Sequence, residues 1–228
     1  MTGIQTYLKQ IVYGGNDGIV TTFAIVSGFA GAQIEGTVAI GGLAVLVFGL
    51  ANLFADGVSM GLGEFLSCRA ETGMLAKRHT RHVAHATADQ QETGARLGRL
   101  LTESGMDETD ARAAAALLAR HPDTGARLLM GAGLGTPMQQ DHSSLKGFIT
   151  FIAFITFGGI PLIPFLVMEA GPKAMILSSA ATYIALSALG LLRWRSSGEP
   201  ITRAVGETLA VGFICANVAF AVGWLVGG

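Results

Sequence analysis

Charge is scarce in this sequence. Only 14% of its 228 residues are Asp, Glu, Lys or Arg, whereas about a quarter are charged in an ordinary soluble domain. Half of the residues are hydrophobic, and the mean hydropathy is +0.51. The scarcity of charge excludes a soluble domain of ordinary composition and predicts a membrane protein.

Cysteine and clustered basic residues are scarce as well. The two cysteines, Cys68 and Cys215, lie far apart in the chain and form neither a disulfide framework nor a metal-binding pair. The formal net charge is −1, and no basic stripe accompanies aromatic residues, as a nucleic-acid surface would require. We therefore expect no nucleic-acid partner.

Apolar runs are what the chain has in abundance. Five are long enough to cross a hydrocarbon core of about 30 Å, which takes roughly 20 helical residues. They are continuous rather than alternating, which excludes a membrane β-barrel. The sequence thus predicts an all-α membrane protein with five transmembrane helices. The runs cover residues 11–34, 37–66, 147–170, 173–192 and 203–227.

The basic residues predict the orientation, because Lys and Arg are retained on the cytoplasmic side of a membrane. Of the fifteen, all but Lys173 fall on one side if the N-terminus is cytoplasmic and the C-terminus lies outside. Ten of them lie between the second and third runs. We therefore predict transmembrane helices 1 and 2 in residues 1–68, a cytoplasmic helical module in 69–146, and transmembrane helices 3 to 5 in 147–228.

Helix ends are recognisable within this module. Residues 68–92 contain few helix breakers and should continue the second span as a helix. Asp107 is expected to cap an alanine-rich helix that ends at Pro122, and Asp123 to cap a third short helix through Met130.

Two carboxylates interrupt the second apolar run. Asp56, Met60 and Glu64 follow one another at four-residue spacing, which places all three on one helix face. Asp17 lies near the start of the first run. Under the predicted orientation all four residues lie toward the cytoplasmic side, so we expect the acids to converge at one level.

The chemistry of these residues points to metal transport. A carboxylate inside a membrane costs roughly 2.5–3.5 kcal/mol on insertion scales and usually marks an ion or proton pathway. Carboxylate oxygens suit divalent cations, and the Met60 thioether favours a transition metal such as Fe²⁺. Clustered carboxylates repel one another when ionised, so metal entry would displace protons. The alternative is that the acids are solvated at the interface, with Asp17 as a helix cap and Met60 as core filler.

Other polar residues carry weaker signals. His79, His82 and His85 lie three apart, but they spread over about 120° of a helix, which favours a solvated polar face over a metal site. Glu207 and Asn217 in the last run are pathway residues or hydrogen-bonding contacts between helices, and we favour the second.

Several segments resemble the vacuolar iron transporter family, which includes plant nodulin-like and yeast vacuolar metal transporters. YGGNDGIVTTFAIVSGFAGA and SMGLGEFLS are similar to its first and second spans, FITFGGIPLIPFL to its third and GETLAVGFICANVAFAVGWLVG to its fifth. The resemblance covers nearly the whole chain and is most specific in the NDG and SMxxGE motifs.

The resemblance implies a five-span homodimer that exports Fe²⁺, and often Mn²⁺, from the cytosol in exchange for protons. It implies no cofactor and no enzymatic activity; the partners are the metal ion, protons, membrane lipid and a second copy. By motif, Asp17, Met60 and Glu64 would line the path at the dimer interface. Asp56 is not part of these motifs, so its assignment rests on helix geometry alone.

The module between spans two and three departs from the family pattern. In the family it is typically rich in glutamates that bind several metal ions, whereas here Gly, Arg and Leu occupy the comparable stretches. Glu71, Glu92 and Glu103 remain. The sequence leaves open whether this module binds metal weakly, differently or not at all.

Two other functions fit parts of the pattern. One is a membrane-anchored metal sensor or scaffold that acts through residues 69–146. The other is an intramembrane aspartyl protease in which Asp17 and Asp56 share a proton. The Ala/Arg-rich module without targeting signals indicates a bacterial plasma membrane, and a vacuolar membrane is the alternative location.

Overall fold

The structure, a computed structural model, describes residues 6–32, 38–134 and 142–227. The regular elements of these residues are all helices, which confirms the all-α class. The chain divides into two compact units, which we call the first unit (Met1–Leu66 with Ser143–Gly228) and the second unit (Ser67–His142). Each is described by itself.

Long helices build the described part of the first unit. Four helical segments are long and apolar enough to cross a membrane, so four of the five predicted spans are supported by length and composition. α2 is not among them, because Asn16 and Asp17 near its middle lower its hydropathy. The helices are α2 (Leu8–Gly31), the first part of α3 (Val38–Ala88), α7 (Ser143–Gly158), α9 (Pro172–Ser197) and α10 (Ile201–Gly227).

The third apolar run is not one uninterrupted helix. After α7 the chain forms a 3₁₀ turn, η1 (Ile160–Leu162), and a short helix, α8 (Ile163–Val167). Pro161 and Pro164 lack the backbone N–H that an α-helical ladder needs, so a continuous helix over this run is wrong in its second half. The buried Ser178 hydroxyl of α9 donates a hydrogen bond of 2.7 Å to the Pro161 carbonyl and holds the turn.

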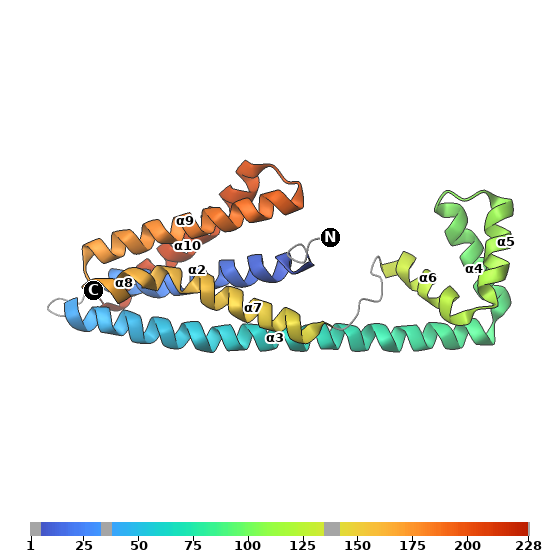
Figure 1. Ribbon diagram of the computed structural model, residues 1–228, viewed down its shortest axis with the longest axis horizontal. Coiled ribbons are helices and arrows are strands. Elements are labelled where there is room, and N and C mark those ends of the chain that lie inside the picture. The colour runs from blue at the N-terminus through green and yellow to red at the C-terminus, as the bar shows by residue number, and fades with distance from the viewer. Residues whose placement is uncertain (1–5, 33–37, 135–141, 228) are drawn as a thin grey trace. The chain divides into compact units, whose positions relative to one another are not determined.

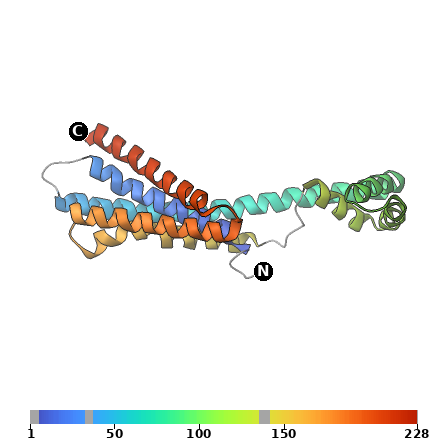
Figure 2. The ribbon, with the colours of Figure 1, turned by 90° about the horizontal axis from the view of Figure 1, so that it is seen from above.

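Other helices enclose α2. It packs against α7, α9 and α10, and both ribbon views draw it running among them (Figures 1 and 2). A Cβ atom on Gly18 would collide with the Phe154 carbonyl oxygen of α7, and one on Gly31 with the Phe220 carbonyl oxygen of α10. Glycine at these positions therefore lets the helix backbones approach closely. α2 is the internal helix of the described first unit.

Glycines allow α3 and α7 to pack closely together. A Cβ on Gly61 would lie 2.9 Å from the Gly147 carbonyl oxygen, and one on Gly147 would lie 2.5 Å from the Gly61 carbonyl oxygen. Gly57 faces Ile155 in the same interface. These contacts fix the face of α3 that turns toward α7.

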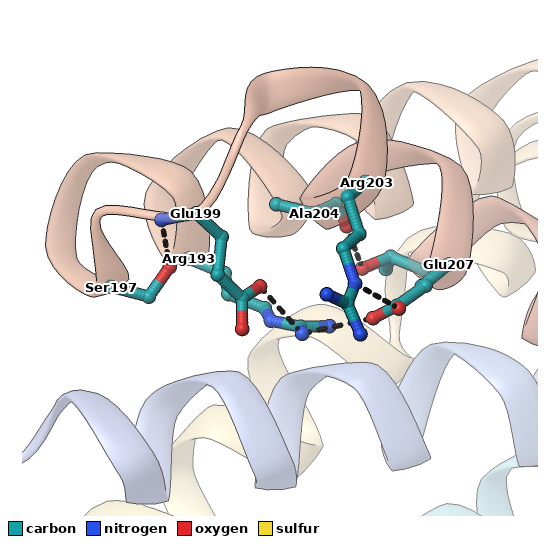
Figure 3. A network of polar contacts seen from close by, with 7 residues as sticks. Arg193, Ser197, Glu199, Arg203, Ala204 and Glu207 are labelled. Carbon is teal, nitrogen blue, oxygen red and sulfur yellow. Dashed lines mark hydrogen bonds and ion pairs between the residues drawn. The ribbon is translucent and has the colours of Figure 1, made fainter.

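An ion-pair network closes the connection between α9 and α10 (Figure 3). The Arg193 guanidinium lies 2.7 Å from a carboxylate oxygen of Glu199 and 2.9 Å from one of Glu207. Arg203 donates to the other Glu207 oxygen at 3.0 Å. Gly198 ends α9 with φ of 71°, a left-handed conformation that glycine adopts without steric cost.

Two aspartates cap helices in the second unit. The Asp107 carboxylate accepts a hydrogen bond of 3.2 Å from the Thr109 backbone N–H, which confirms the predicted cap. The Asp89 carboxylate accepts one of 2.8 Å from the Glu92 N–H, so the helix expected to continue the second span ends before Asp89 and a new one begins. The helices that follow α3 are α4 (Gln90–Glu103), α5 (Glu108–Ala119) and α6 (Pro122–Leu134).

Asp123 does not cap α6, contrary to the prediction. The helix begins at Pro122, whose missing N–H is harmless at the first helical position. Asp123 therefore lies inside the first turn, where it pairs with Arg127 at 2.9 Å. The helix also continues past Met130, its predicted end.

Candidate metal path

Four side chains form a row along α3. Asn52, Asp56, Met60 and Glu64 follow one another at four-residue spacing, and all four are half-buried. α3 is uninterrupted over these residues, so the spacing keeps them on one face of the helix. The three residues of α3 that the sequence nominated as metal ligands thus share their face with a fourth polar side chain.

Asp17 of α2 lies near this row. Its half-buried carboxylate interacts electrostatically with that of Asp56 on α3. Neither aspartate forms an ion pair with a basic side chain in the described residues. A capping role for Asp17 is excluded, because α2 already begins at Leu8, more than two turns earlier.

Asn52 holds the Asp56 carboxylate from one turn away. Its amide Nδ2 donates a hydrogen bond of 2.6 Å to Asp56 Oδ2. This leaves the second carboxylate oxygen as a separate acceptor and restricts how Asp56 can turn. Sequence reasoning missed Asn52, although an amide four residues before an acid on one helix is a recognisable signal.

Gln10 of α2 makes the corresponding contact to Glu64. Its Nε2 donates a hydrogen bond of 2.8 Å to Glu64 Oε1 across the two helices. Gln10 is only 5% exposed, although it lies in the first turn of α2. Sequence reasoning missed this residue too, because the sequence alone does not give the register between two helices.

Met60 lies between the polar row and the apolar core. Its side chain packs against a buried cluster that includes Phe23, Leu53 and Phe154. Apolar neighbours therefore surround part of this side chain, while its helix position keeps it between Asp56 and Glu64. A soft ligand in that position would contribute to the choice of metal.

The row provides few anionic ligands at any one point. Among the described residues, no three His, Cys, Asp or Glu side chains gather closely enough to hold a metal ion. Two groups of side chains, which we call stations, lie between α2 and α3. One contains Asp17 and Asp56, and the other contains Glu64 and Gln10. Such an arrangement suits transient binding of an ion more than a closed structural site, which needs about four ligands.

The three histidines of the second unit do not form one group. His79 Nε2 lies 3.1 Å from Asp123 Oδ1 and its side chain is 15% exposed. His82 is half-buried and His85 is exposed. The predicted solvated position is correct for His85. It is wrong for His79, which links α3 to α6 through Asp123.

The two polar residues of the last run also differ from each other. Glu207 pairs with Arg193 of α9 and so makes the expected contact between helices. Asn217 is exposed, and its Nδ2 donates to the Phe213 carbonyl of its own helix at 2.7 Å. Asn217 therefore makes no hydrogen bond between helices in the described residues.

Comparison with known proteins identifies the family. The VIT family model matches residues 8–224. Vacuolar iron transporter 1 of Arabidopsis thaliana is 26% identical over 220 residues, which are 96% of this chain and 86% of the relative. The vacuolar iron transporters of Toxoplasma gondii and Plasmodium falciparum are 29% and 30% identical, over 96% and 95% of this chain and 74% and 81% of their own lengths.

These relatives are transporters by name, in agreement with the prediction that the chain is not an enzyme. The resemblance carried by the NDG and SMxxGE motifs is confirmed, because the matched residues include both. The chain belongs to the VIT family.

Proposed function

We propose that this protein carries a divalent transition metal ion, Fe²⁺ or Mn²⁺, out of the cytosol in exchange for protons. The observation that carries the proposal is the pair of half-buried carboxylates, Asp17 and Asp56, that interact across α2 and α3 of a VIT-family chain. Carboxylates in a membrane helix bundle usually mark an ion pathway. Relatives named as iron transporters support iron as the cargo.

The path that we propose follows the polar row of α3. The ion enters at Glu64, passes the Met60 thioether and reaches Asp56 opposite Asp17. Oxygen ligands at both stations accept a divalent cation, and the sulfur between them favours a softer transition metal such as Fe²⁺ over Mg²⁺. When both aspartates carry charge they repel each other, so a proton released by one as the ion arrives provides the exchange.

We propose that α2, the first of the five predicted spans, also crosses the membrane in spite of its polar residues. Eleven of its 24 residues are buried, so protein rather than lipid surrounds much of this helix. A span enclosed by other helices tolerates polar groups that a lipid-facing one would not. With the distribution of Lys and Arg, five spans give a cytoplasmic N-terminus and place Glu64 toward the cytosol.

We further propose that the working form is a homodimer. A mostly apolar groove of about 1020 Å³ runs along α2, α3 and α10. Small residues such as Gly28 and Ala51 line it, which suits close packing of a further helix. Asn52 also lines the groove and donates to Asp56. A second copy seated there would close the path on the side that one chain leaves open.

The proposal is tested by metal flux into proteoliposomes that contain only this protein. We expect saturable uptake of Fe²⁺ and Mn²⁺, with Co²⁺ and Zn²⁺ compared in the same assay, and acidification of the side from which the metal departs, followed with a pH-sensitive dye. If an imposed pH gradient does not change the flux, proton exchange is refuted and the protein is a uniporter. Absence of flux for every ion would favour the sensor or scaffold alternative.

A further inference from the structure

The side-chain amide of Gln10 has a hydrogen-bonded nitrogen and an oxygen without a hydrogen-bond partner among the described residues. A carboxylate oxygen only accepts hydrogen bonds, so the amide nitrogen of Gln10 must face Glu64 Oε1. The amide oxygen does not take part in this hydrogen bond, and it is buried without a hydrogen-bond partner among the described residues. A buried acceptor left in this state is destabilising, because it has given up water without gaining a protein partner.

A bound cation would remove this destabilisation. Amide oxygens of Asn and Gln are ordinary ligands of divalent cations beside carboxylates. An amide supplies an oxygen without adding a charge, so Glu64 gains a co-ligand and no repelling neighbour. A neutral ligand is also cheaper to place in a membrane helix than a second carboxylate.

We propose that Gln10 completes the metal-entry site at Glu64: its N–H group orients the carboxylate and its amide oxygen is a ligand of the incoming divalent cation. This rests on the proposed transport function, in which Glu64 receives the ion. It adds a ligand from α2 to the path along α3, so that each station draws on both helices.

The test is equilibrium binding of Mn²⁺ alone to the purified full-length protein in lipid nanodiscs. We expect Gln10→Leu, which removes both the orienting donor and the ligand oxygen, to weaken Mn²⁺ binding by about tenfold. Gln10→Glu loses the orienting N–H and adds a charge beside Glu64, but it supplies a ligand oxygen, so it should lose clearly less affinity than Gln10→Leu. A purely structural hydrogen bond predicts that both variants lose affinity alike, and that result would overturn the proposal.

Thr22→Val is the matched control. The Thr22 hydroxyl is also buried on α2 without a hydrogen-bond partner among the described residues, and we expect its removal to leave Mn²⁺ binding unchanged. If Gln10→Leu fails to fold, judged by thermal unfolding, Gln10→Asn replaces it: the amide is kept but withdrawn by one methylene, and binding should weaken. Unchanged affinity in Gln10→Leu or in Gln10→Asn contradicts a ligand role.

Binding is measured here without transport. Wild-type protein that binds Mn²⁺ but gives no flux would refute the transport function and leave the Gln10 comparison intact. Normal flux with a Gln10→Leu variant that binds like wild type would refute the role of Gln10 alone.

Discussion

The two units use their carboxylates differently. In the second unit, Asp89 and Asp107 cap helices, and Glu92 and Glu108 pair with arginines one turn away. In the described first unit, Asp17 and Asp56 interact with each other and form no ion pair with a basic side chain. A helix cap or an ion pair is enough to account for the presence of an acid. Acids that neither cap a helix nor pair with a basic side chain, inside a membrane bundle, are the candidates for function.

The first unit contains its own exception to this difference. Glu207 lies at the start of α10 and is held by Arg193 and Arg203 (Figure 3). We therefore assign it to the α9–α10 connection and not to the path. The partner of an acid, rather than its presence in an apolar run, distinguishes the two roles.

The largest effect is expected from Asp17→Asn, with Glu108→Gln as its counterpart in the second unit. Removing the Asp17 charge should lower Mn²⁺ flux by at least about tenfold, because an anionic ligand and a proton carrier are replaced by a neutral amide that cannot titrate. Glu108 belongs to an exposed pair with Arg112, and such pairs contribute about 0–1 kcal/mol. Its variant should transport like wild type; equal losses in both would remove the distinction between the units.

Packing gives the second comparison. A Cβ on Gly18 meets the Phe154 carbonyl oxygen, whereas one on Gly98 of α4 finds the Ala115 Cβ at 3.8 Å, an ordinary contact. Gly18→Ala should destabilise the protein by about 1–3 kcal/mol through overpacking. Gly98→Ala should stabilise its helix by up to about 1 kcal/mol. Thermal unfolding in detergent measures both, and a stable Gly18→Ala protein would contradict the close helix contact.

A smaller change is expected from Met60→Leu. The two side chains have similar volumes, so stability should fall by less than about 1.5 kcal/mol. Loss of the thioether should reduce discrimination of Fe²⁺ against Mg²⁺ while total flux persists. The measurement is competition between these ions in proteoliposomes. Unaltered selectivity would leave Met60 as a core residue only.

The cap of α5 should respond to pH. Hydrogen bonds from the Thr109 hydroxyl and backbone N–H hold the pKa of Asp107 below its usual value. The ionised cap therefore stabilises α5 above the ordinary aspartate pKa, and this contribution is lost as pH falls through the lowered one. We expect Asp107→Ala to speed amide exchange in the first turn of α5 at neutral pH, measured by mass spectrometry, and the difference from wild type to shrink in acid. Asp110→Ala, which keeps the cap, should change exchange less.

The smallest effect is expected when His79, His82 and His85 are replaced together by glutamine. Flux should stay near the wild-type rate, because none of them lies in the first unit. Loss of the His79–Asp123 contact should lower the stability of the second unit by about 0–1 kcal/mol. A large loss of metal binding would show that these histidines bind metal after all.

Composition and spacing predicted much of this fold. Four of the five apolar runs correspond to helical segments that are long and apolar enough to cross a membrane, and Asp107 was recognisable as a cap because an alanine-rich helix follows it directly. The helix break after α7 was missed because the run is apolar throughout. Pro161 and Pro164 are the sequence signal that indicates it. The cap at Asp89 was missed for a similar reason: a single aspartate inside a helical pattern gives no strong stop signal.

The site was less predictable than the fold. Helix geometry grouped Asp56, Met60 and Glu64 correctly on one face of α3, since that grouping needs only the helical period. The contact of Gln10 with Glu64 depends on the register between α2 and α3. That register is set by packing of the whole bundle, which no local pattern reports.

The most direct test of the account is the rate of Mn²⁺ uptake by proteoliposomes that contain wild-type protein or the Asp56→Asn variant. Asp56 lies outside the family motifs and is connected to the path only by its place on α3, its contact with Asn52 and its interaction with Asp17. We predict saturable uptake by the wild type and a rate at least about tenfold lower for Asp56→Asn at equal protein content. Equal rates for the two proteins would contradict a metal path along this face of α3.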